Sequence, residues 1–174
     1  AWKSAEPGVL FWDTILRESV PDCYADLGFR TVSTNPCGEI PLCPYDSCRL
    51  LAINLYSYVD KPFTKEASFN FDKFRRHVAA AMRMMDDIID LELEKVEAIL
   101  EKISKDPEDE DIRQVEVKLW EKIREKALQG RRTGLGITAE GDMLAALGLR
   151  YGTDEATDFA VEIQKTLAVE AYRT

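Results

Sequence analysis

The sequence has few of the residues that several kinds of catalytic site require. It contains a single histidine, His77, and its four cysteines, at positions 23, 37, 43 and 48, include no CxxC pair. A protease-like thiolate needs a base such as histidine, and zinc sites usually pair cysteines two to four residues apart. Because His77 follows two arginines on a helical pattern, a surface position is the better interpretation. We expect neither thiolate catalysis nor a metal site.

Two further absences narrow the class of protein. No apolar run approaches the roughly 18 residues of a membrane span. The net charge of −9 argues against a broad nucleic-acid surface, which needs clustered Lys and Arg. Apolar residues make up 45% of the chain and charged residues 32%, which is the balance of a globular protein. We therefore expect no membrane and no nucleic-acid partner.

The chain ends and the cysteine content bear on cellular context. The sequence starts at Ala1 without Met or a signal-peptide pattern, and it stops at Thr174 inside a helical pattern. We expect an excised part of a longer protein. Four cysteines without a secretory signal favour a reducing, cytoplasmic compartment over a disulfide scaffold.

The order of predicted elements favours an α/β fold. Hydrophobic periodicity and turn signals predict, in order, a helix near 10–16, strands within 29–34 and 48–56, helices at 71–103 and about 112–128, a strand within 131–138, and helices at 139–147 and 154–173. The segment 48–56 is almost continuously apolar, which predicts a strand buried on both faces. Residues 71–128 would form a long helical hairpin. Strands alternating with helices indicate a parallel or mixed sheet, of which this chain holds only part.

The segment at residues 33–48 reads STNPCGEIPLCPYDSC. A contribution to the stability of the fold does not explain this composition well. Proline withholds a ladder donor and glycine loosens the backbone, so both weaken an ordinary strand. In an extended chain, Asn35, Cys37 and Glu39 would project from one side, roughly 6.6 Å apart. They would present an amide, a thiol and a carboxylate to one substrate. Because His77 is a poor candidate for a catalytic base, the remaining chemistry is hydrogen-atom transfer at a neutral thiol, with Glu39 accepting a proton.

The segment at 33–48 and the residues that follow it resemble a motif of a known protein family. NPCGE at 35–39, the following IPL, Cys48 eleven residues after Cys37, and AINL at 52–55 are similar to the finger loop of ribonucleotide reductases. The Pro and Gly spacers look most like the adenosylcobalamin-dependent class II members. The resemblance extends over most of the chain, through SAEPGVLFWD at 4–13, MDDIID at 85–90 and RRTGLGIT to DMLAALGLRY at 131–151.

The resemblance implies a fold and a set of roles. Residues 1–174 would be a fragment of one catalytic domain, a ten-stranded α/β barrel crossed by a finger loop at 33–48. Cys37 would be the thiyl radical that removes hydrogen from the 3′ carbon of the ribose, and Glu39 would take the 3′ hydroxyl proton. Asn35 would bind the sugar hydroxyls. Cys48 would be half of a dithiol whose partner cysteine lies outside residues 1–174, so Cys23 and Cys43 receive no role.

The family also implies a cofactor and partners. Adenosylcobalamin would generate the radical, with contacts largely outside this chain. The substrate would be a ribonucleoside di- or triphosphate, and a thioredoxin-like protein would restore the dithiol. Exposed sheet edges would favour self-association.

Two alternatives stay open at this level. One is another thiyl-radical enzyme, such as a glycyl-radical relative that shares the barrel and finger. The other is a non-catalytic interaction module built on the helical hairpin at 71–128.

Overall fold

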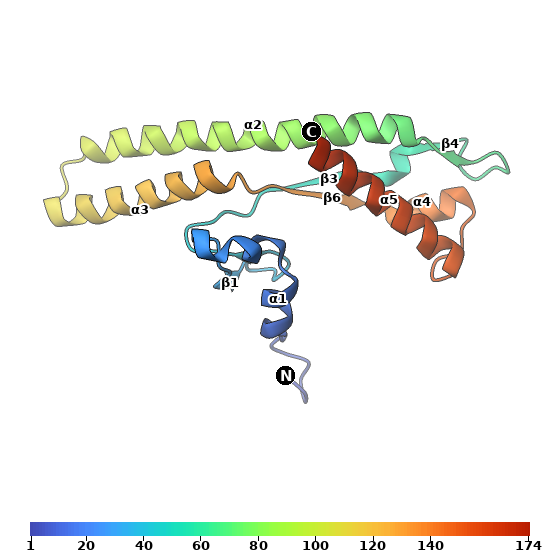
Figure 1. Cartoon of the computed structure of the whole chain (residues 1–174), viewed down its shortest axis with the longest axis horizontal. Helices are drawn as coiled ribbons and strands as arrows, with labels where there is room; N and C mark the ends of the chain where they lie inside the picture. Colours follow the sequence, from blue (N-terminus) through green and yellow to red (C-terminus); the bar gives the residue numbers. More distant parts are fainter. The chain divides into compact units, whose positions relative to one another are not determined.

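The computed structural model describes residues 1–174, which form two compact units. Unit 1 comprises residues 1–48 and 93–132, and unit 2 comprises residues 49–92 and 133–174. The long helix α2 (Phe71–Ser104) contributes residues to both units (Figure 1).

Unit 1 combines a short two-stranded hairpin with helices. Besides the last part of α2, its elements are α1 (Trp12–Glu18), the 3-10 helix η1 (Val20–Leu27), β1 (Ser33–Thr34), β2 (Pro41–Leu42) and α3 (Glu110–Gly130). An ion pair between Arg124 and Glu97 links α3 to the end of α2. After α3, Arg131 takes a left-handed conformation with φ 41°, and its amide caps the carbonyl of Ala127. This is a common way for a helix to end.

Unit 2 is organised around one pair of parallel strands. Its elements are β3 (Leu50–Asn54), the 3-10 helix η2 (Leu55–Tyr58), β4 (Val59–Asp60), β5 (Ser68–Phe69), the first part of α2, β6 (Gly134–Thr138), α4 (Glu140–Leu147) and α5 (Asp154–Arg173). Strands β3 and β6 pair in parallel from Leu50 opposite Gly134 to Asn54 opposite Thr138. Strands β4 and β5 form a separate antiparallel pair.

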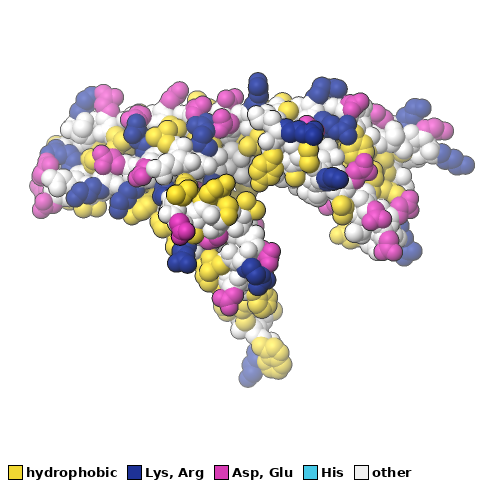
Figure 2. Space-filling view, in the orientation of Figure 1, with side chains coloured by type: hydrophobic (Ala, Val, Ile, Leu, Met, Phe, Trp, Pro, Cys, Tyr) yellow, Lys and Arg dark blue, Asp and Glu magenta, His cyan; other side chains and the backbone are white.

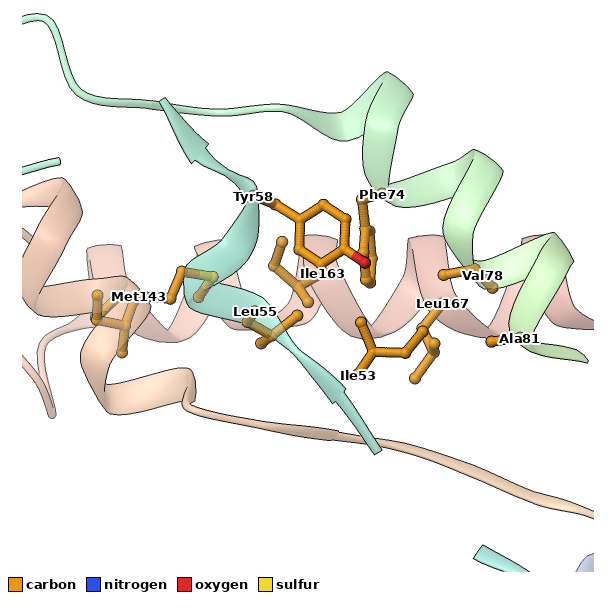
Figure 3. Packing of buried hydrophobic residues seen from close by; sticks show 11 residues of the cluster. Ile53, Leu55, Tyr58, Phe74, Val78, Ala81, Met143, Ile163 and Leu167 are labelled. Carbon is orange, nitrogen blue, oxygen red and sulfur yellow. The ribbon is translucent and has the colours of Figure 1, made fainter. Parts of the chain in front are cut away.

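The apolar core lies within unit 2. Figure 3 shows side chains of β3, η2, α2, α4 and α5 packed against one another. Tyr58 and Phe74 meet edge to face with ring centroids 5.1 Å apart, a favourable aromatic arrangement. The fully buried residues Phe74, Val78 and Ile163 belong to faces of α2 and α5 that the period of three and four residues describes.

Most predicted elements are confirmed, but the predicted extent and burial of one strand are wrong. The predicted strand at 48–56 is limited to β3, and only one of its faces is buried: Ile53 is buried, whereas Leu50 is 61% exposed. The predicted α/β class is confirmed, and β3 pairs with β6 in parallel. The strands form three two-stranded pairs, and no closed barrel is present in this chain. A ten-stranded barrel therefore stays an implication of the resemblance.

The long helices α2, α3 and α5 carry many charged side chains. None of them combines the length with the apolar run that a membrane crossing requires. Figure 2 shows Lys and Arg side chains intermixed with Asp and Glu on the face in view, so neither sign of charge forms a separate patch there.

Candidate active site

The segment at 33–48 forms a β-hairpin with a tight turn at its tip. The amide of Gly38 donates to the carbonyl of Asn35 at 3.0 Å, and the amide of Asn35 donates to Ile40 at 3.1 Å. Pro36 occupies the second turn position, which suits its fixed φ, and Gly38 takes a φ of 85° that favours glycine. The predicted extended conformation of residues 35–39 is therefore wrong, because the two spacers build a turn.

The turn nevertheless brings three of the four predicted site residues together. The side-chain nitrogen of Asn35 donates to Glu39 Oε1 at 2.6 Å and contacts Cys48 Sγ at 3.8 Å. The side-chain oxygen of Asn35 accepts the Ile40 amide at 2.9 Å. Asn35 is only 6% exposed, so these bonds form with little competition from water. One amide thus holds the carboxylate and a thiol of the predicted site.

Cys37 lies at the turn between Asn35 and Glu39. Its side chain is exposed, as is that of Cys48, and all four cysteines are free thiols. A reactive group that approaches from outside the hairpin can therefore reach both sulfurs.

The arm that leads from β2 to Cys48 is held by residues that the sequence analysis missed. Asp46 forms an ion pair with Arg132 and accepts a hydrogen bond from the Cys43 thiol at 3.5 Å. Arg132 also donates to the carbonyl of Pro41 at 2.8 Å. Cys43 is buried, as expected for a packed small residue. Burial raises the pKa of the Cys43 thiol, and the Asp46 carboxylate raises it further.

A second carboxylate anchors the arm that enters the hairpin. Asp22, on η1, accepts hydrogen bonds from the amide of Thr31 at 3.0 Å and from its hydroxyl at 2.6 Å. Desolvation by burial would raise the pKa of Asp22, but the two bonds from Thr31, together with Ser19 and the charge of Arg30, outweigh it and the pKa is lowered. Thr31 is 4% exposed, so this anchor is largely shielded from solvent.

The residue after Cys48, Arg49, begins unit 2 with a partly buried ion pair. Arg49 donates through Nε to Glu92 Oε2 at 2.6 Å and through Nη2 to Glu92 Oε1 at 2.7 Å. A two-point pair of this kind fixes orientation as well as position. It ties the start of β3 to α2 within unit 2.

The comparisons with known proteins identify the family. The family described as the ribonucleotide reductase barrel domain matches residues 1–174, which is the whole chain. This chain belongs to the ribonucleotide reductase barrel-domain family.

Several vitamin B12-dependent reductases resemble this barrel-domain chain. A vitamin B12-dependent ribonucleoside-diphosphate reductase of Thermoplasma acidophilum is 32% identical over 99% of the chain and 18% of its own length. One of Mycobacterium tuberculosis is 31% identical over 99% of the chain and 20% of its own length. A vitamin B12-dependent ribonucleotide reductase of Streptomyces clavuligerus is 25% identical over 99% of the chain. The chain thus spans about a fifth of the first two relatives. No solved structure matches it significantly.

Family membership supports the resemblance seen in the sequence, but it assigns no residue roles. The hairpin geometry supplies the local contacts among Asn35, Glu39 and Cys48. The roles of these residues and of Cys37 stay predictions. Asp46 and Arg132 could not have been found from local spacing, because they are far apart in the chain and neither belongs to the NPCGE motif.

Proposed function

We propose that this chain carries the finger hairpin of a vitamin B12-dependent ribonucleotide reductase and contributes its radical-bearing and reducing cysteines. The observation that supports this most directly is the contact of Asn35 with both Glu39 and Cys48 on the hairpin whose turn holds Cys37. A carboxylate and two thiols then serve a single sugar ring.

The proposed reaction uses each group once. The Cys37 thiyl radical takes the hydrogen atom from C3′ of the ribose and becomes a thiol. Glu39 accepts the proton of the 3′ hydroxyl, and the 2′ hydroxyl leaves as water after protonation. Cys48 and a second cysteine thiol supply two electrons and two protons and become a disulfide. Cys37 then returns its hydrogen atom to C3′, which regenerates the radical and yields the deoxyribonucleotide.

Asn35 has a defined place in this scheme. Its side-chain nitrogen donates to Glu39 Oε1, and this bond orients the carboxylate that accepts the proton. Its contact with Cys48 keeps the reducing thiol close to the same carboxylate. Asn35 therefore positions both the base and the thiol. We propose that the same side-chain amide also hydrogen-bonds the sugar hydroxyls.

The cofactor implied by the relatives' names fits the exposed position of Cys37. When bound, adenosylcobalamin supplies the radical that is passed to a protein thiol. A thiol at the exposed tip of a hairpin is accessible to such a group, whereas a buried one like Cys43 is not. We assign no cobalamin contact to residues 1–174, in line with the expectation that these contacts lie largely elsewhere.

Substrate and partners follow from the same assignment. The first two relatives are named for ribonucleoside diphosphates, so we propose a diphosphate as the substrate of this chain's enzyme. A thioredoxin-like protein reduces the disulfide of Cys48 in a reducing cytoplasm. Self-association through open strand edges stays a prediction.

Replacing Cys37 by serine in the full-length enzyme tests the function. Cys37→Ser should lower the rate of deoxyribonucleotide formation by at least about 10³-fold, because a hydroxyl cannot replace the thiol in hydrogen-atom transfer. Substrate conversion with adenosylcobalamin and a dithiol protein is measured by chromatography. Cys23→Ser, at another exposed cysteine of unit 1, is the matched control and should keep full activity.

Cys48→Ser separates the two cysteine roles. It should stop multiple turnovers with a dithiol protein as reductant, since only one thiol of the reducing pair remains. Undiminished turnover in Cys37→Ser would contradict the radical role proposed for Cys37.

A further inference from the structure

We propose that Asp46 and Arg132 clamp the outgoing arm of the finger hairpin, residues 41–48. The clamp holds Cys48 beside Asn35 and keeps Cys43 out of disulfide exchange. This inference rests on the reducing role proposed for Cys48, and it makes Asp46 and Arg132 positioning residues.

Arg132 holds the arm at two separate points. One guanidinium nitrogen pairs with Asp46, and the other donates to the carbonyl of Pro41 at 2.8 Å. A planar guanidinium presents its donors in a fixed fork, so it sets the distance between both partners. The side chains of Arg132 and Asp46 are 20% and 8% exposed, which limits screening by solvent. One side chain therefore fixes the start of β2 and the turn that follows it.

Asp46 organises the turn between β2 and Cys48. Its Oδ1 accepts the amide of Ser47 at 2.9 Å, and its Oδ2 accepts the Cys43 thiol at 3.5 Å. Within this turn Tyr45 has a φ of 64°, which is unfavourable for a residue with a bulky side chain. Such a conformation persists only where the surroundings fix it. Lys122, 5.1 Å above the Tyr45 ring, adds a further contact from α3.

The clamp prevents a side reaction between Cys43 and Cys48, which are only five residues apart. After one turnover, Cys48 forms a disulfide with its partner cysteine. A thiolate at Cys43 could attack the Cys48 sulfur, form a Cys43–Cys48 bond and release the partner thiolate. Cys43 is 5% exposed and donates its hydrogen to Asp46, so it is neither accessible nor ionised. The clamp thereby limits thiol–disulfide exchange to Cys48 and its partner cysteine.

Pulse labelling of thiols in the full-length protein tests the clamp directly. Trypsin releases residues 31–49 as one peptide, so mass spectrometry can locate N-ethylmaleimide on Cys37, Cys43 and Cys48 in the same fragment. In the unmodified protein Cys43 should react at least about tenfold more slowly than the other two. Asp46→Asn should accelerate Cys43 labelling at least about tenfold. Asp26→Asn, at an exposed aspartate of the same unit, is the control and should change nothing.

A second variant and a rescue experiment distinguish loss of the clamp from general unfolding of the protein. Arg132→Lys keeps the charge but loses the fork, so Cys43 labelling should fall between the unmodified protein and Asp46→Asn. Asp46→Asn should also lose turnover progressively as the Cys43–Cys48 disulfide accumulates. Adding Cys43→Ser to Asp46→Asn should restore turnover, which a purely structural defect would not allow.

The outcomes separate the clamp from the proposed function. Unchanged Cys43 labelling in both Asp46→Asn and Arg132→Lys overturns the clamp, whatever the activity. Turnover loss that Cys43→Ser does not restore overturns the exchange role. If the unmodified protein lacks reductase activity, the proposed function fails, while the labelling result still decides whether the clamp exists.

Discussion

The core of unit 2 and the hairpin of unit 1 at residues 33–48 are stabilised by different interactions. In unit 2, apolar side chains of α2, α5 and the segment after β3 pack in the buried cluster. In the hairpin, the strands contain only two residues each, and polar side chains determine the conformation. Asn35 holds the tip, and Asp46 with Arg132 holds the outgoing arm.

The two kinds of interaction have different effects: apolar burial stabilises the fold, whereas hydrogen bonds position the side chains of the candidate site. Apolar burial is non-directional and contributes roughly 25 cal/mol per Å², so it stabilises unit 2 without placing any single atom accurately. Hydrogen bonds contribute little net stability, but they depend strongly on distance and angle. We therefore expect substitutions in the unit 2 core to lower stability, and substitutions in the hairpin to alter chemistry first.

The largest expected effect on stability is at Ile163. This residue of α5 is fully buried, so Ile163→Ala should lower the free energy of unfolding by about 2–5 kcal/mol through lost burial and a cavity. Val161→Ala is the matched control on the same helix. Val161 is 60% exposed, and its substitution should change stability by no more than about 0.5 kcal/mol. Urea denaturation followed by far-ultraviolet circular dichroism measures both, and equal losses would contradict the assignment of the core.

An intermediate effect is expected where β6 meets the start of β3. A Cβ at Gly134 would lie 2.7 Å from the carbonyl oxygen of Arg49, which is backbone and cannot move freely. Gly134→Ala should therefore cost about 1–3 kcal/mol through overpacking. Gly136 lies two residues along the same strand with no atom near its would-be Cβ. Gly136→Ala should be neutral or slightly stabilising in the same assay, and a similar loss at both positions would contradict the steric explanation.

The sequence predicted the elements of the apolar scaffold well, because their signals are local and periodic. The step of three and four residues from Phe71 to Ile103 predicted α2, and the spacing after Asp154 predicted α5. Burial of β3 was predicted less well, because an apolar run does not reveal whether the chain itself covers both faces. Leu50 shows the difference, since it is apolar and mostly exposed.

The residues of the candidate site stay a prediction, and the conformation expected for them was wrong. The motif selected Asn35, Cys37 and Glu39, and the structure gathers Asn35 and Glu39 through a turn instead of an extended strand. Pro36 and Gly38 were interpreted as loosening the strand, although their combination is also typical of a turn. The ion pair of Arg132 with Asp46 could not be predicted from the sequence, because it depends on where α3 ends and no local pattern encodes it.

The smallest expected effect is at the polar anchor of the incoming arm. The pKa of Asp22 is lowered in the folded chain, so this group contributes stability above its unfolded pKa of about 3.9 and loses it as the pH falls through the folded value. Thr31→Val removes the hydroxyl bond, and stability at pH 7 should fall by less than about 1 kcal/mol. The difference from the unmodified protein should shrink as the pH falls below about 3.

Tryptophan fluorescence is the suitable probe for this anchor, because Trp2, Trp12 and Trp120 all belong to unit 1. Asp22→Asn should flatten the same acid limb of the stability profile, whereas the exposed Asp26→Asn should preserve it. A pH-independent loss in Thr31→Val would mean that the hydroxyl acts through packing and not through the Asp22 charge. The hairpin arm would then depend on shape, like the core of unit 2, and the contrast between the two regions would not extend to this anchor.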